Sequence, residues 1–179
     1  VYFSLPKELN ESLVLTRAET GEELSDYSYT VIADRVRLLS YFGEEEQVTV
    51  PGTVTIAGTQ YNTVELTPGM WDEKCGKIRS LAFDEGVVVP ADCEGLFRYM
   101  SELTELDIKG LDWSQVTNMS RMFDYCCSLH EIDLSGMNTA NVTNMSSMFA
   151  DCYGLERIDL SGFDTHNVTD MRHMFSGCN

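Results

Sequence analysis

Positive charge is scarce in this sequence. It has 12 lysines and arginines against 29 aspartates and glutamates, for a formal net charge of −17. Nucleic acid and anionic lipid both bind positive surfaces, so we expect neither as a partner. No run approaches the roughly 18 apolar residues of a transmembrane helix, and no basic start followed by an apolar run marks a signal peptide. These features favour a self-repelling, extracellular protein without membrane insertion in this stretch.

Signatures of catalysis and of cofactor binding are also missing. The three histidines, His130, His166 and His173, have no Ser or Cys at a spacing typical of a nucleophile and its base. No Gly-rich phosphate loop, paired catalytic carboxylates, Cys-x-x-Cys pair or zinc-ligand spacing can be identified. We therefore expect no enzyme, no cofactor and no resident metal.

What the sequence does contain is a repeat of 26 residues in its C-terminal half. Three copies occupy residues 103–128, 129–154 and 155–179. A period of 20 to 50 residues is typical of a solenoid, in which supersecondary units stack on one another. A solenoid offers a surface rather than a pocket, so binding is the function that the period favours.

Spacing within the middle copy predicts its local structure. Ile132 and Leu134 alternate with polar residues, which indicates a short strand over 131–135, with equivalents over 105–109 and 157–161. Asn144 stands at a helix N-cap position. The apolar residues that follow it are spaced at i, i+3, i+4 and i+7, the inward stripe of a short helix: Met145, Met148, Phe149 and Cys152. We expect an α/β, leucine-rich-repeat-like solenoid with a parallel sheet on one side and short helices on the other. The side chains expected in its core include Met119, Phe123, Met145 and Phe149.

The N-terminal half is less regular. Residues 1–29 are interpreted as a linker or leading segment, and residues 30–102 as β-rich irregular repeats. Within them we expect a hairpin turn at 57–60, a short helix at 70–75 and a strand at 78–83. The stretch 82–100 is interpreted as a degenerate earlier copy of the repeat. Both ends look cut, so we expect a fragment of a longer array.

The six cysteines follow the repeat rather than a disulfide framework. Three of them fall at one position of successive copies: Cys126, Cys152 and Cys178. A cysteine that recurs in register is most often a small buried hydrophobe. A disulfide or a metal ligand is the alternative.

The motif running from Ile132-Asp133-Leu134-Ser135-Gly136 to Cys152 resembles the repeat of BspA-like leucine-rich-repeat proteins of bacterial surfaces. The last copy repeats it from Ile158 to Cys178, and the first copy departs from it at Lys109, Leu111, Trp113 and Gln115. The resemblance implies an exported, adhesin-like protein at the cell surface or outside the cell, with its signal and anchor outside this fragment. It also implies that the partners are host or neighbouring-cell proteins.

Candidate partner-binding residues are the polar or aromatic positions of the three predicted strands and of the turns after them: Glu105, Asp107, Lys109, Trp113, Glu131, Asp133, Ser135, Arg157, Asp159 and Ser161. Asp107, Asp133 and Asp159 form a ladder that could bind calcium or a partner. Alternatively, each carboxylate accepts hydrogen bonds from turn amides. Trp113 either anchors a partner or covers the earlier, irregular units.

The leading functional hypothesis is a binding or adhesion module for a protein or a glycan. The alternatives are a structural spacer, or the non-catalytic arm of a larger surface protein or enzyme.

Overall fold

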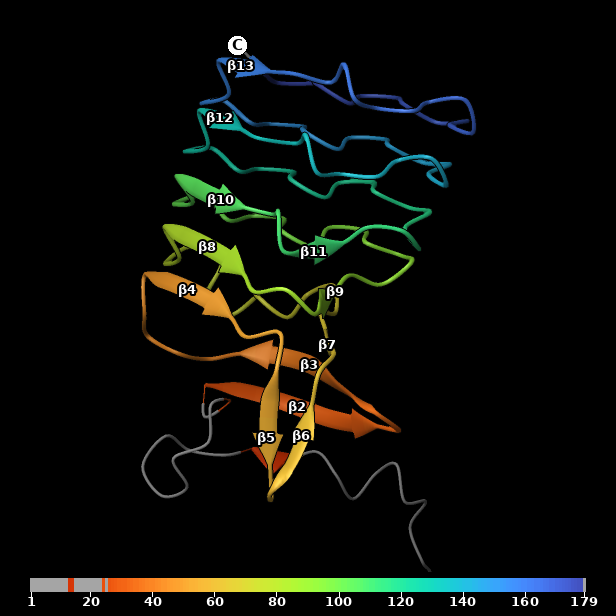
Figure 1. Ribbon diagram of the computed structural model, residues 1–179. Helices are drawn as coiled ribbons and strands as arrows, with labels where there is room; N and C mark the ends of the chain where they lie inside the picture. The colour runs from red at the N-terminus through yellow and green to blue at the C-terminus, as the bar shows by residue number, and fades with distance from the viewer. Residues whose placement is uncertain (1–12, 15–23, 25, 179) are drawn as a thin grey trace, which may run out of the picture.

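The computed structural model describes residues 13–14, 24 and 26–178 of the chain. Among these residues the only regular elements are thirteen short β-strands, and the chain winds into a β-solenoid whose coils lie one above another (Figure 1). No described segment forms a helix long and apolar enough to cross a membrane. The predicted α/β class is therefore wrong, whereas the predicted solenoid is found.

An antiparallel sheet closes the N-terminal end of the stack. It consists of β1 (Leu13–Val14), β2 (Tyr27–Ile32) and β3 (Arg35–Tyr41). Buried aromatic rings pack at this end of the stack: the Tyr27 and Tyr41 rings lie 5.0 Å apart, and the Tyr41 and Trp71 rings 5.6 Å apart. The predicted leading segment 1–29 lies mostly outside the described residues.

Beyond β3 the strands pair in parallel, coil upon coil. One ladder joins β4 (Gln47–Val50), β8 (Ser80–Phe83) and β10 (Glu105–Asp107). A second extends from β3 through β7 (Val64–Glu65) and β9 (Val87–Val88) to β11 (Leu111–Asp112). Further along the stack, β12 (Glu131–Ile132) pairs in parallel with β13 (Arg157–Ile158). The predicted parallel stacking is confirmed, although the strands are shorter than predicted.

A hairpin projects from the stack beside these ladders (Figure 1). It pairs β5 (Val54–Ile56) with β6 (Thr59–Tyr61) in antiparallel fashion. Ala57 and Gly58 join the strands with φ of 50° and 81°. Positive φ at both central residues matches the right-handed twist of a hairpin, which confirms the predicted turn.

The predicted helices are absent, and tight turns take their place. The Phe123 amide donates to the Met148 carbonyl of the next coil at 2.9 Å, whereas the adjacent Met122 amide donates to the Met119 carbonyl at 3.3 Å. Alternate amides thus donate to a carbonyl of the neighbouring coil and to the carbonyl three residues back in their own coil. In an α-helix each amide donates to the carbonyl four residues back. The stretch 70–75 also lacks the predicted helix, since the Asp72 amide donates to the Gly69 carbonyl at 3.1 Å.

Left-handed residues explain why no helix forms. Arg121 and Tyr125 have φ of 54° and 66°, and Ser147 and Asp151 have φ of 55° and 54° in the next coil. A residue in this conformation interrupts a right-handed helix. Asn144 still accepts a hydrogen bond from the Ser146 amide at 3.0 Å, as a cap would, but a turn follows it.

The apolar stripe nevertheless faces the interior, as predicted. Met119, Phe123, Met145 and Phe149 are all fully buried. The phenylalanines of successive coils stack through the core, with ring centroids 5.6, 5.2 and 5.6 Å apart along the series Phe97, Phe123, Phe149 and Phe175. The stack of coils and the stack of rings therefore share one axis.

The repeated cysteines belong to this core. All six thiols are free. The Cys152 Sγ donates to the Phe123 carbonyl of the preceding coil at 3.0 Å, and the Cys126 Sγ makes the same bond to Phe97 at 3.2 Å. Burial raises the pKa of the Cys152 thiol to about 12 and that of Cys126 well above its ordinary value. These thiols are small buried donors, which agrees with the packing interpretation.

Candidate partner-binding surface

The residues predicted to bind a partner lie, with one exception, on the outside of the solenoid. Apart from Trp113, every predicted residue is exposed: Glu105, Asp107, Lys109, Glu131, Asp133, Ser135, Arg157, Asp159 and Ser161. We call this set the strand face. It follows β10, β12 and β13, which lie one above another along the stack (Figure 1).

Ion pairs connect neighbouring coils along the strand face. The Lys109 Nζ lies 3.2 Å from the Asp133 Oδ2, and the Arg157 guanidinium lies 3.3 Å from the Glu131 carboxylate. A shallow depression lies between β12 and β13, lined by Glu131, Ile132, Asp133, Arg157, Ile158 and Asp159. The strand face is thus a polar, slightly hollowed surface with both signs of charge.

The aspartate ladder of the strand face organises turns. The Oδ1 atoms of Asp107, Asp133 and Asp159 accept the amides two residues ahead at 3.0, 3.0 and 2.8 Å. Hydrogen bonds from Ser135 and the nearby Lys109 hold the pKa of Asp133 at about 2. The turn interpretation therefore accounts for these carboxylates. Within the described residues, no group of three or more His, Cys, Asp or Glu side chains is arranged to hold a metal ion.

Trp113 does not lie on the surface. Its side chain is only 2% exposed and packs in the core. In the next copy the same repeat position is taken by Thr139, which is equally buried. The interpretation of Trp113 as an exposed anchor is wrong, because its position points into the stack.

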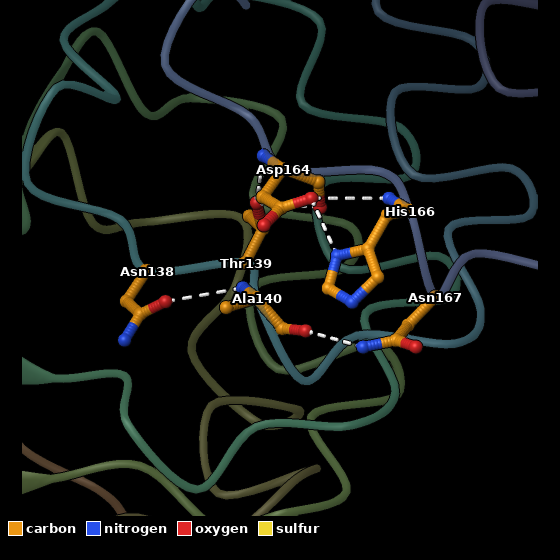
Figure 2. A network of polar contacts seen from close by, with 6 residues as sticks. All are labelled: Asn138, Thr139, Ala140, Asp164, His166 and Asn167. Carbon is orange, nitrogen blue, oxygen red and sulfur yellow. Dashed lines mark hydrogen bonds and ion pairs between the residues drawn. The ribbon is translucent and has the colours of Figure 1, made fainter.

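Polar contacts also join the coils at the turns that follow β12 and β13 (Figure 2). The Thr139 hydroxyl donates to the Asp164 carbonyl at 3.1 Å and accepts the Asp164 amide at 2.7 Å. The Asn167 side-chain amide donates to the Ala140 carbonyl at 2.8 Å. The Asp164 Oδ1 meets the His166 Nδ1 at 2.7 Å. These side chains are largely occupied in holding successive turns in register.

A row of exposed tyrosines forms a second surface feature, which the sequence analysis missed. Tyr99, Tyr125 and Tyr153 are 46%, 42% and 46% exposed. Their ring centroids lie 6.0 and 5.9 Å apart, with the planes at 71° and 80°. We call these three residues the tyrosine ladder. Large apolar side chains gathered on a surface mark interaction sites more often than scattered ones do.

Charged groups flank the tyrosine ladder. The Arg98 guanidinium carbon lies over the Tyr99 ring, 4.5 Å from its centroid. The Tyr153 hydroxyl donates to the Asp151 Oδ1 at 3.1 Å, which raises the pKa of Tyr153. Burial raises the pKa of Asp124, and the charge of Asp151 raises it further, against the opposing effect of Arg98 and Arg121. Glu94 pairs with Arg121 at 3.9 Å, so three carboxylates and two guanidinium groups lie in this region.

The repeat register hid the tyrosine ladder from sequence reasoning. Tyr99 and Tyr125 are equivalent positions, but Tyr153 is offset from the next equivalent, which Asp151 occupies. A search for exposed aromatic residues near the same turn of each copy would have found all three.

Comparison with known proteins gives a family match and one distant structural similarity. Residues 91–179 match the model of a family described as a Mycoplasma protein of unknown function, DUF285. No curated protein matches the chain. Among solved structures, a leucine rich cell surface protein from Faecalibacterium prausnitzii A2-165 is 19% identical with a TM-score of 0.37. The similarity covers 74% of this chain and 52% of that one, so the chain spans about half the length of that protein.

Proposed function

We propose that this chain is a repeat region of a BspA-like cell-surface protein and that it acts as a non-catalytic binding or adhesion module for a protein or glycan. The observation that carries the proposal is the register of the stack. Coil pairing places equivalent side chains of successive copies beside one another, as with Glu131 and Arg157. A partner with its own repeating contacts can bind such an array over many coils.

The shape of the molecule supports a surface function. Solenoids present long, continuous faces, and their binding surfaces are assembled from one contribution per repeat. The strand face and the tyrosine ladder are two such assemblies. A standard protein–protein interface buries about 800 Å² on each partner, an area that several adjacent coils are needed to supply.

The cell-surface location is supported by the repeat motif. The sequence from Ile132 to Cys152, repeated from Ile158 to Cys178, resembles that of BspA-like surface proteins. The net charge of −17 keeps such a chain soluble and disfavours partners that are themselves acidic.

A structural spacer is the second candidate function. The ion pair between Arg157 and Glu131 and the Thr139–Asp164 contacts stabilise the stack whether or not a partner binds. A spacer needs only a rigid stack. A binding module also needs a surface whose substitution abolishes binding of its partner.

The test is adhesion of the immobilised chain to a panel of extracellular-matrix proteins, cell-surface glycans and intact cells. A strand-face variant carries Glu131→Gln, Asp133→Asn and Arg157→Gln. A matched control with the same net charge change carries Asp34→Asn, Arg35→Gln and Glu73→Gln, all at exposed positions. The binding module predicts saturable capture of at least one panel member that the strand-face variant weakens and the control does not. If neither the wild type nor any variant captures a panel member, the spacer is favoured.

A further inference from the structure

The tyrosine ladder combines three properties that together define a class of partner. Its rings are exposed and lie in a row across adjacent coils. The face of an aromatic ring carries negative electrostatic potential and attracts cations. The surrounding chain is strongly acidic, with a net charge of −17.

One ring of the ladder already holds a guanidinium group. Arg98 covers Tyr99 at 4.5 Å, and among the described residues it is the only cation over an aromatic ring. Tyr125 and Tyr153 stand next in the row and are exposed to a similar extent. The contact at Tyr99 shows that a planar cation fits against this row.

Two carboxylates lie beside the remaining rings. Asp151 accepts the Tyr153 hydroxyl at 3.1 Å. Asp124 precedes Tyr125 in the chain and is half-buried. Burial and the charge of Asp151 raise its pKa even though Arg98 and Arg121 act in the opposite direction. Two carboxylates that repel each other are stabilised when a further cation enters between them.

The backbone of the ladder is strained at two of its positions. Tyr99 and Tyr125 both have φ of 66°, a conformation that costs a bulky residue energy. Gly177, with φ of 80°, takes the same position of the last copy. The same left-handed turn recurs in each copy, and it sets Tyr99 and Tyr125 side by side on the surface.

From this geometry we infer that the tyrosine ladder, with Asp124 and Asp151, docks an arginine-bearing segment of a partner protein. The inference rests on the proposed binding function and names its partner class. Arginine fits better than lysine, because the planar guanidinium both stacks on a ring and forms paired hydrogen bonds with a carboxylate.

Titration calorimetry at physiological salt tests this inference with three probes. The probes are an oligoarginine peptide, an oligolysine peptide of equal length and a neutral β-linked oligosaccharide. The ladder variant, Tyr125→Leu with Tyr153→Leu, leaves the charge unchanged. Tyr125→Phe keeps the ring. Asp151→Asn is matched by Asp159→Asn, which also removes one carboxylate but on the strand face.

Oligoarginine should bind the wild type more tightly than oligolysine does. The ladder variant should weaken oligoarginine binding about tenfold, since two exposed cation–π contacts are lost. Tyr125→Phe should retain wild-type affinity, and Asp151→Asn should weaken binding more than Asp159→Asn does. Thermal unfolding of each variant checks that the stack is intact.

Equal oligoarginine binding by the wild type and the folded ladder variant would overturn the inference, because it would reflect diffuse attraction to an acidic chain. Ring-dependent binding of the oligosaccharide in preference to oligoarginine would also overturn it. The peptide titration reports on the ladder alone, whereas the adhesion panel reports on the proposed function, so the two can fail separately.

Discussion

The rings of Phe123 and Phe149, one coil apart, stack with their centroids 5.2 Å apart and their planes 12° from parallel. Phe149 makes a second stacked contact with Phe175 at 5.6 Å and 4°. A fully buried ring between two others loses packing on both faces when it is removed. The ring at the end of the row has a neighbour on one face only.

Substitution of Phe149 should therefore cost more stability than substitution of Phe175. Phe149→Ala should lower the free energy of unfolding by about 3–5 kcal/mol, the usual range for a buried phenylalanine. Phe175→Ala should cost clearly less, because Phe175 is 41% exposed. Urea unfolding of both variants measures the difference. Equal costs would mean that the molecule is one globule without a stacked order.

The buried thiols should resist modification in the folded protein. The pKa of Cys152 is about 12, so almost no reactive thiolate exists at pH 8. Cys126 and Cys152 should react with a thiol reagent only after unfolding, whereas the half-buried Cys75 should react first. Cys152→Ala should cost about 1–2 kcal/mol, since it leaves a small cavity and an unpaired Phe123 carbonyl. A bridge between Cys126 and Cys152 in the purified protein would contradict this.

Acid should weaken the turn at Asp133 over a defined range. Its pKa is about 2 in the folded chain against an ordinary value of 3.8. The stabilisation from its ionised form is therefore fully present above pH 3.8 and is lost as the pH falls toward 2. Asp133→Asn keeps the acceptor for the Ser135 amide but removes this pH dependence. Urea unfolding of both proteins between these pH values should show the difference shrinking with acid, and a constant difference would argue against the Lys109 and Ser135 contacts.

Much of the architecture could be predicted from the sequence because the repeat is strict. The period fixed the stacking and the parallel strands, and the apolar stripe identified Met119 and Phe149 as core. The hairpin at Ala57 and Gly58 followed from its turn residues. These features depend on spacing, and spacing is visible in a single chain.

The helices could not be rejected on spacing alone. Met145, Met148, Phe149 and Cys152 face inward both in a helix and in the turns found here. The distinguishing signal lay in comparing the copies. Gly95 and Gly177 have positive φ, and the equivalent positions of neighbouring copies are Arg121 and Asp151, which also have positive φ. The tyrosine ladder was missed for a related reason, since its third member is out of register.

Glycine should be tolerated at the left-handed positions. Ser147 has φ of 55°, so Ser147→Gly should leave the free energy of unfolding unchanged or raise it by up to about 1 kcal/mol. The matched Ala150→Gly, at a buried residue without positive φ, should lower it by at least about 0.5 kcal/mol. Comparable losses from both substitutions would be the result expected of a helix.

The hydrogen-bond partner of the Phe123 amide tests the coil architecture most directly. Scalar coupling across hydrogen bonds, measured by NMR on the deuterated, isotope-labelled chain, identifies the acceptor carbonyl of each amide. The solenoid predicts coupling from Phe123 to Met148 in the next coil, where the atoms lie 2.9 Å apart. Coupling from Phe123 to Met119, four residues back in its own copy, would show a helix and contradict the stack of turns on which the tyrosine ladder rests.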